Sequence, residues 1–184
     1  MVVEDVVNTF ALLAANRLGV QSAAIGARAT LWIRDPSNLW QLRSTKYRWE
    51  RGAQQPSARS STVYSLRGRG VGAPGMAYLK RGRECVIVRD LPIFGDDPSG
   101  YERRVAHLGL TGEAIRSWSR HSRSMMSAKF PFKVNQDGLE PFGVVCVDCM
   151  EPFDTASDEE LATIMEDLMK EVGNELTLIW KNRI

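Results

Sequence analysis

One stretch, residues 141–180, constrains the fold of this 184-residue chain more than any other. Residues 142–147 (FGVVCV) form an almost unbroken apolar run rich in valine, which predicts a strand buried on both faces. Ser157 and Glu160 follow with the spacing of a capping box at a helix start. Apolar residues then recur every three or four positions, on one face of a long helix: Leu161, Met165, Leu168, Val172, Leu176 and Ile179. The end of the chain therefore predicts a sheet with an amphipathic helix packed on it.

The apolar stripe on this last helix is wider than one sheet face can cover. It is extended by Ile164, Met169, Leu178 and Trp180. A helix that is apolar on more than one side needs two partners, here its own sheet and another helix. We therefore predict a homodimer formed through the terminal helices, with an interface built from Phe10, Leu13, Leu168, Val172, Leu176, Ile179 and Trp180.

The rest of the chain divides into short segments bounded by turn residues. We predict helices at 1–19, 76–80 and 157–182, one or two helical turns at 113–118, strands at 29–34, 39–44, 84–91, 124–132 and 141–149, and loops at 50–62 and 92–112. The second loop is long enough to be a lid or a binding loop. This order predicts a single α+β domain over residues 1–184, with a central antiparallel sheet. Both terminal helices pack on one face of that sheet, and a lid of short helix and loops covers the other.

The charge is spread unevenly, although the net charge is only +2. Residues 41–135 hold 18 Lys or Arg and 7 Asp or Glu, whereas residues 136–184 hold 3 and 12. Such asymmetry fits an anionic ligand, a nucleic-acid surface, oppositely charged faces meeting across a dimer, or solvated surface with no partner. The basic residues are scattered arginines without a nucleic-acid motif, so we expect no nucleic acid as partner.

The remaining bulk features favour a cytoplasmic protein. No window of the sequence has the ~18 apolar residues that a membrane span needs, so no membrane partner is expected. The first residues carry acids where a signal peptide carries bases. Three cysteines, an odd number, offer no disulfide framework.

The chain resembles the GAF domain family over about residues 8–179. The resemblance is carried by the Gly72–Gly75 turn before a short helix, the strand Val86–Asp90, the segment from Arg123-Ser124-Met125-Met126 to Pro131, and Phe142–Val145 followed by Phe153-Asp154. It implies a PAS-related fold with a cavity between the sheet and the lid. Some members bind small molecules there, and others only dimerise through their terminal helices.

Departures from the family pattern argue against several classes of ligand. Asp148-Cys149 stands where cyclic-nucleotide-binding members have Asn-Lys, and four residues rather than three separate Phe153 from Asp158. Cys85 is followed by Val86 in a predicted strand, which argues against bilin attachment. Residues 66–82 and 91–112 lack the cysteines of the free-methionine-sulfoxide reductases of this family. We expect no cofactor, whether bilin, haem or cyclic nucleotide.

The residues themselves suggest no catalytic site. Cys146 and Cys149 have a zinc-like spacing, but neighbours three apart on a strand point to opposite faces, which favours two small buried hydrophobes. His107 and His121 are the only histidines, and nothing supplies the other parts of a triad or a metal site. The glycines at 68–75 lack a following Gly-Lys-Ser/Thr, which favours a lid hinge over a phosphate loop. We expect neither a metal nor an enzymatic activity.

Arginines near the lid are candidates for binding an anion, because the guanidinium fork matches a carboxylate or phosphate. The predicted ligand-binding set is Arg69, Tyr78, Arg89, Tyr101, Trp118 and Arg123, although simple solvation is an alternative for the arginines. The predicted function is a cytoplasmic sensory or regulatory domain that binds a small anionic molecule. It signals through its helical homodimer interface to a downstream effector domain or protein. The alternative is a ligand-free dimerisation or protein-interaction module, with the pocket filled by Tyr78, Met125 and Phe130.

Overall fold

A single antiparallel sheet lies at the centre of the molecule. The computed structural model describes residues 9, 17, 28–35, 37–50, 63–80, 85–116, 122–130, 141, 143–153 and 157–181. Six strands in these residues pair in the order β3-β2-β1-β6-β5-β4, with bounds β1 Arg28–Asp35, β2 Asn38–Glu50, β3 Val63–Ser65, β4 Val86–Val88, β5 Ser124–Phe130 and β6 Gly143–Cys149. The predicted α+β architecture is confirmed.

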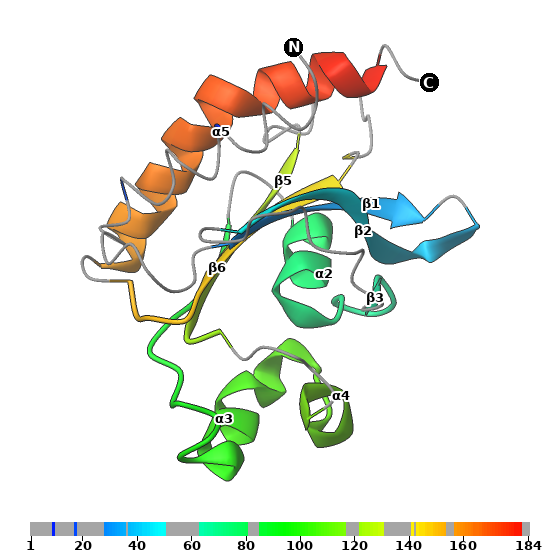
Figure 1. Cartoon of the computed structure of the whole chain (residues 1–184). Helices are drawn as coiled ribbons and strands as arrows, with labels where there is room; N and C mark the ends of the chain where they lie inside the picture. The colour runs from blue at the N-terminus through cyan, green and yellow to red at the C-terminus, as the bar shows by residue number, and fades with distance from the viewer. Residues whose placement is uncertain are drawn as a thin grey trace.

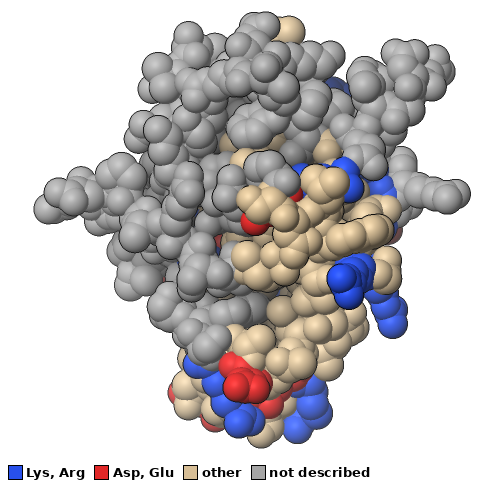
Figure 2. All heavy atoms as spheres, turned by 90° about the vertical axis from the view of Figure 1, so that its right-hand side faces the viewer, with Lys and Arg blue, Asp and Glu red and all other residues tan. Residues whose placement is uncertain are grey.

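Helices cover both faces of this sheet (Figure 1). The long helix α5 lies across one face, and α2, α3, η1 and α4 lie on the other, which we call the lid face. Their bounds are α2 Gly72–Leu79, α3 Pro98–Val105, η1 Ala106–Leu108, α4 Gly112–Arg116 and α5 Asp158–Lys181. In the view of Figure 2, charged side chains of both signs gather at the bottom, where α3 and α4 lie.

The predicted hairpin of the first two strands is confirmed. Two side chains shape its turn, because the Asp35 carboxylate accepts from the Ser37 amide at 2.8 Å and the Asn38 side chain accepts from the Trp40 amide at 3.2 Å. β1 then pairs with β2 on one side and with β6 on the other. This pairing makes β1 an interior strand of the sheet.

The strand predicted to be buried on both faces is β6, and all seven of its residues are buried. Because side chains alternate along a strand, Val145, Val147 and Cys149 join the core under α5, whereas Val144 and Cys146 join the core under the lid. β5 is buried throughout as well and pairs with β6 along its whole length. The two core layers therefore meet on the β5–β6 pair.

The predicted capping box starts α5. The Ser157 hydroxyl accepts from the Glu160 amide at 3.3 Å, and the Glu160 carboxylate accepts from the Ser157 amide at 3.2 Å. The helix lies against β5 and β4 and buries its apolar stripe there, namely Leu161, Met165, Leu168, Met169 and Val172.

The prediction of a loop over 92–112 is wrong for residues 98–108, which form α3 and η1. Pro98 and Gly100 suggested a loop, but Pro is favoured in the first turn of a helix, where its missing N–H is not needed. Asp97 caps α3, with its side chain accepting from the Gly100 amide at 2.8 Å. The predicted helical turns at 113–118 are confirmed as α4 over the residues that are described.

Three further elements differ from the predictions. The short helix begins at Gly72 and not at Met76, so the end of the glycine-rich turn is its first turn. β3 was not predicted, because three residues are too few to show an alternating pattern. The strand predicted over 84–91 is shortened to β4, Val86–Val88.

Part of the N-terminal half lies outside the described residues, including residues 51–62 of the loop predicted over 50–62, whose first residue, Glu50, ends β2. Of the predicted helix over 1–19, only Thr9 and Arg17 are described, and both are helical. Arg17 forms an ion pair of 2.6 Å with Glu171 on α5, which places residue 17 beside that helix. Among the described residues, no helix has the length and apolar character needed to cross a membrane.

Candidate ligand-binding site

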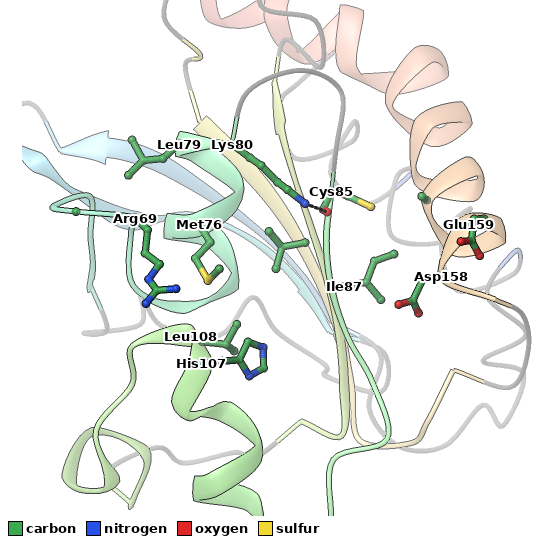
Figure 3. A pocket seen from close by; sticks show the side chains of 13 residues that line it. Arg69, Met76, Leu79, Lys80, Cys85, Ile87, His107, Leu108, Asp158 and Glu159 are labelled. Carbon is green, nitrogen blue, oxygen red and sulfur yellow. Dashed lines mark hydrogen bonds between the residues drawn. The ribbon is translucent and has the colours of Figure 1, made fainter.

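A pocket of about 840 Å³ opens along the outer edge of β4, and its volume lies in the range of small-molecule sites. We call it the β4 pocket. Among the described strands β4 is the last of the sheet, so this edge has no further strand beside it. Figure 3 shows β4 at the centre of the pocket, with α2 and η1 on one side and the start of α5 on the other.

The glycine-rich turn brings Arg69 to this pocket. Gly68 and Gly70 have φ values of 65° and 81°, a left-handed conformation that glycine adopts without strain. A Cβ atom on Gly70 would also collide with the Gly75 carbonyl, so the turn can pack closely on the first turn of α2. The turn therefore holds the side chain of Arg69 beside α2, at the border of the pocket.

The first turn of α5 supplies two acidic side chains, Asp158 and Glu159. The capping box fixes where the helix starts, and carboxylates are favoured at a helix N-terminus. Hydrogen bonds from its own backbone amide and from Ser157 lower the pKa of Glu159, so this group is anionic at neutral pH. Asp158 is also 3.2 Å from the guanidinium of Arg89, at the end of β4.

The two sides of the β4 pocket therefore differ in charge. Arg69 and Lys80 lie on the lid side, where the Lys80 ammonium donates to the Cys85 carbonyl at 3.3 Å, and Asp158 and Glu159 lie on the α5 side. The surface between them is apolar and includes Met76, Leu79 and Ile87. This arrangement suits a ligand with an anionic group at one end and hydrogen-bond donors at the other.

Buried side chains of the described residues pack in the layer between the sheet and the lid. Tyr101 is fully buried and donates to the Ser122 carbonyl at 2.8 Å, and burial together with the nearby Asp148 raises its pKa. Tyr78 is buried in the same layer. The GAF resemblance implied a cavity here, whereas the β4 pocket lies at the edge of the sheet. Two of the predicted ligand residues, Tyr78 and Tyr101, thus belong to the core under the lid.

The other predicted ligand residues are spread around β4. Arg69 lines the β4 pocket, and Arg89 lines a smaller pocket beside it. Arg123 donates to the Leu91 carbonyl at 3.0 Å and so holds the segment that follows β4. Trp118 lies outside the described residues. A direct ligand contact by any of these residues stays a prediction.

Lys80, Asp158, Glu159 and Ala162 line the pocket, and the sequence did not suggest them as ligand residues. The capping box placed both acids at a helix start, but it gave no sign of what that helix start would face. His107 also lines the pocket, although the sequence suggested no ligand-binding role for it. These residues are far apart in the sequence, from Lys80 to Ala162, and only folding brings them together. No local sequence pattern therefore identifies them.

The residues predicted for the dimer interface are placed only in part. Leu168 and Val172 are buried within the single chain, against the sheet. The structure describes the backbone but not the side chains of three others on α5, namely Leu176, Ile179 and Trp180. The last two, Phe10 and Leu13, lie outside the described residues. Leu178 on the same helix is 60% exposed, so α5 does carry an uncovered apolar side chain. The homodimer stays a prediction.

Cys146 and Cys149 face opposite sides of the sheet, as their spacing predicted. Cys146 lies in the lid-face core and Cys149 in the core under α5, so the two thiols cannot converge on one ion. Burial, with the charge of Asp148 nearby, raises the pKa of Cys146 to about 12. Within the described residues, no group of three or more His, Cys, Asp or Glu side chains is placed to hold a metal.

The fold and the pocket together define an α+β domain with a ligand-sized site at one edge of its sheet. No protein-family model matches the chain, and no curated protein matches it. Similar solved structures include a GAF domain, at 14% identity and a TM-score of 0.43, with 92% of this chain and 88% of that chain covered.

Two further similar structures cover almost as much of the chain. One is fRMsr of Staphylococcus aureus in its reduced form, at 12% identity and a TM-score of 0.45, covering 91% of this chain and 94% of that one. The other is residues 122 to 287 of a methyl-accepting chemotaxis protein, at 13% identity and a TM-score of 0.44, covering 95% and 91%. One of these three similar structures is thus a GAF domain, the family that the sequence resembles. At these identities they assign no ligand or activity to this chain.

Proposed function

We propose that this chain is a sensory or regulatory domain that binds a small polar molecule in the β4 pocket and transmits its binding to α5. The observation that carries this proposal is that the pocket is shared by two parts of the molecule. Arg69 and His107 belong to the lid, whereas Asp158 and Ala162 belong to the first turns of the long helix. A molecule that touches both sides favours the arrangement that spaces them best, and so it shifts α5 relative to the lid.

The charges of the pocket limit which kinds of molecule can bind there. An anionic group is best placed near Arg69 and Lys80, and a cationic or donor group near Asp158 and Glu159. From the sequence we proposed an anionic ligand. We now propose that this molecule has an anionic group at one end and hydrogen-bond donors at the other. Met76 and Ile87 accommodate the less polar part between the two ends.

The helix α5 is suited to carry the signal. It packs on β5 and β4, and its ion pair with Arg17 joins it to the N-terminal segment. A shift of its first turn therefore reaches both ends of the chain. We propose that a homodimer formed by these terminal segments passes the change to an effector.

A thermal-shift panel of amino acids, nucleotides and organic acids tests the proposal. We expect at least one compound with an anionic end to raise the melting temperature of the wild type. The shift should fall in Arg69→Gln and persist in Arg67→Gln, because the exposed Arg67 does not line the pocket. No stabilisation by any compound of the panel, or an equal loss in both variants, would count against the site.

A second candidate is a ligand-free dimerisation module. It is favoured by the buried side chains that pack under the lid and by the exposed Leu178 on α5. Both candidates predict a dimer, so the thermal-shift panel distinguishes them: this one predicts that no compound stabilises the wild type. Light scattering tests the dimer itself, which we expect Leu178→Glu to weaken and a change at the exposed Thr163, Thr163→Glu, to leave intact. A wild-type chain that stays monomeric at high concentration would rule this candidate out.

A further inference from the structure

A second pocket, of about 360 Å³, adjoins the β4 pocket. Ile87 and His107 line both pockets, so the two are neighbours along β4. The basic side chains of the second pocket are Arg89, Arg103, Arg104 and His107, and its apolar surface comes from Ile87, Val88 and Leu91. None of its lining residues is acidic. We call it the arginine pocket.

The three arginines come from two elements that the fold brings together. Arg89 directly follows β4, and Arg103 and Arg104 lie in the last turn of α3, where cations are favoured by the helix dipole. A side-chain nitrogen of Arg104 is 3.5 Å from the carbonyl oxygens of Arg89 and Asp90, at the outer limit for a hydrogen bond. Since a guanidinium has five N–H donors, these two weak contacts leave most of them for another acceptor.

Two carboxylates pair with Arg89 from outside the pocket. Asp158 and Asp90 are 3.2 and 3.7 Å from the Arg89 guanidinium, and neither lines the arginine pocket. Among the described residues, the side chain of Arg103 has no hydrogen bond or ion pair. The charge of Arg89 is partly balanced by these two carboxylates, and an anion in the cavity would offset the positive charge that Arg103 and Arg104 add beside it.

We propose that the arginine pocket binds a phosphate group, and that the molecule in the β4 pocket carries, besides its anionic end near Arg69, a phosphate that lies in the arginine pocket. The second half of this inference rests on the proposed function. A phosphate carries about −1.5 to −2 charges at neutral pH and three strong acceptor oxygens, whereas a carboxylate carries one charge and two oxygens. Three arginines from two directions match the phosphate better.

Binding of inorganic phosphate, measured by calorimetry at constant ionic strength with acetate as the comparison anion, tests this assignment. The variants are Arg103→Gln, Arg104→Gln and their combination, with Arg67→Gln as a control of equal charge change outside both pockets. Each lost guanidinium should weaken phosphate binding roughly tenfold, because a charge-assisted hydrogen bond is worth about one power of ten or more. Arg67→Gln should bind phosphate like the wild type.

Phosphate binding that is unchanged in both single variants, or acetate that binds as tightly as phosphate, overturns the assignment. The circular dichroism of each variant shows whether it is folded, and the single variants suffice if the combined one is not. The two proposals fail separately. If phosphate binding is lost in the Arg103 and Arg104 variants but no compound of the thermal-shift panel depends on Arg69, the phosphate site is supported and the sensory proposal is rejected. If a compound depends on Arg69 but phosphate binding does not depend on Arg103 and Arg104, the β4 pocket is supported and the phosphate site is rejected.

Discussion

Arg28 and Asp148 are register partners on β1 and β6, and the Arg28 guanidinium lies 2.8 Å from the Asp148 carboxylate. Asp148 is only 5% exposed, and its second oxygen accepts from the Ser122 hydroxyl at 2.7 Å. The Ser122 carbonyl in turn accepts from the hydroxyl of Tyr101 on α3. This chain of contacts connects the centre of the sheet to the lid.

Asp148→Ala should lower the free energy of unfolding by about 3 kcal/mol, because it leaves the partly buried Arg28 and the Ser122 hydroxyl without the carboxylate. Urea denaturation measures the loss. The control is Glu102→Ala, which removes a more exposed ion pair with Arg116, 2.7 Å long, and should cost less than about 1 kcal/mol. If both substitutions cost the same, the buried network does not hold the lid to the sheet.

Gly70→Ala and Gly68→Ala should differ in their cost to stability. Both positions have positive φ, so an alanine at either is strained by about 1–2 kcal/mol. At Gly70 the new Cβ would also collide with the backbone of Gly75, whereas at Gly68 it would meet no atom within 4 Å. Thermal or urea unfolding should therefore show the larger loss for Gly70→Ala. Equal losses would mean that the turn does not pack as described.

The buried Lys129 makes stability depend on pH. Its ammonium donates to the Lys80 carbonyl, and burial lowers its pKa below the 10.5 of an ordinary lysine. Between the lowered pKa and 10.5 the unfolded chain binds more protons than the folded one, so this group makes the folded state more stable as pH rises through that window. Lys129→Met removes the group and should flatten this rise.

Unfolding free energies of the wild type and Lys129→Met, compared from pH 7 to 9.5, measure the effect. Above this range Tyr64 and Tyr101 act in the opposite direction, because burial raises their pKa values in the folded state. The unfolding free energy of the Met variant minus that of the wild type should fall as pH rises. A difference that stays constant or grows would contradict a lowered lysine pKa.

The three cysteines should react with thiol reagents at different rates. Cys85 lines the β4 pocket, whereas Cys149 is fully buried and Cys146 has a pKa of about 12. At pH 8 a thiol with that pKa is a thiolate in about one molecule in ten thousand. Iodoacetamide labelling followed by peptide mass spectrometry should modify Cys85 first, and all three in urea. Labelling of Cys146 as fast as Cys85 would be inconsistent with its buried position.

The sequence predicted the elements whose signals are local. The capping residues Ser157 and Glu160 and the apolar run of β6 depend only on neighbours in the chain, and both were found as expected. α3 was missed because Pro98 and Gly100 also suit a loop. The distinguishing feature is the Asp97 cap one residue before the proline, a signal that was present in the sequence.

The site was less predictable than the fold. Arg69 and Arg89 were chosen for the chemistry of their side chains, and each does line a pocket along β4. Tyr78 and Tyr101 were chosen in the same way but fill the core. An aromatic side chain suits a core as well as a pocket, so residue type does not separate the two. The pocket also depends on where α5 begins relative to β4, which is set by long-range packing.

The most direct test of the account asks whether a molecule sits between the lid and α5. Ala162 lines the β4 pocket from the second turn of α5, and the neighbouring Thr163 is exposed and does not line it. Wild type, Ala162→Trp and Thr163→Trp are each incubated with a small-molecule extract, and the retained compounds are identified by mass spectrometry. The account predicts a compound that the wild type and Thr163→Trp retain and that Ala162→Trp, with its pocket filled, does not. Retention of the same compounds by all three proteins, or of none by the wild type, would contradict it.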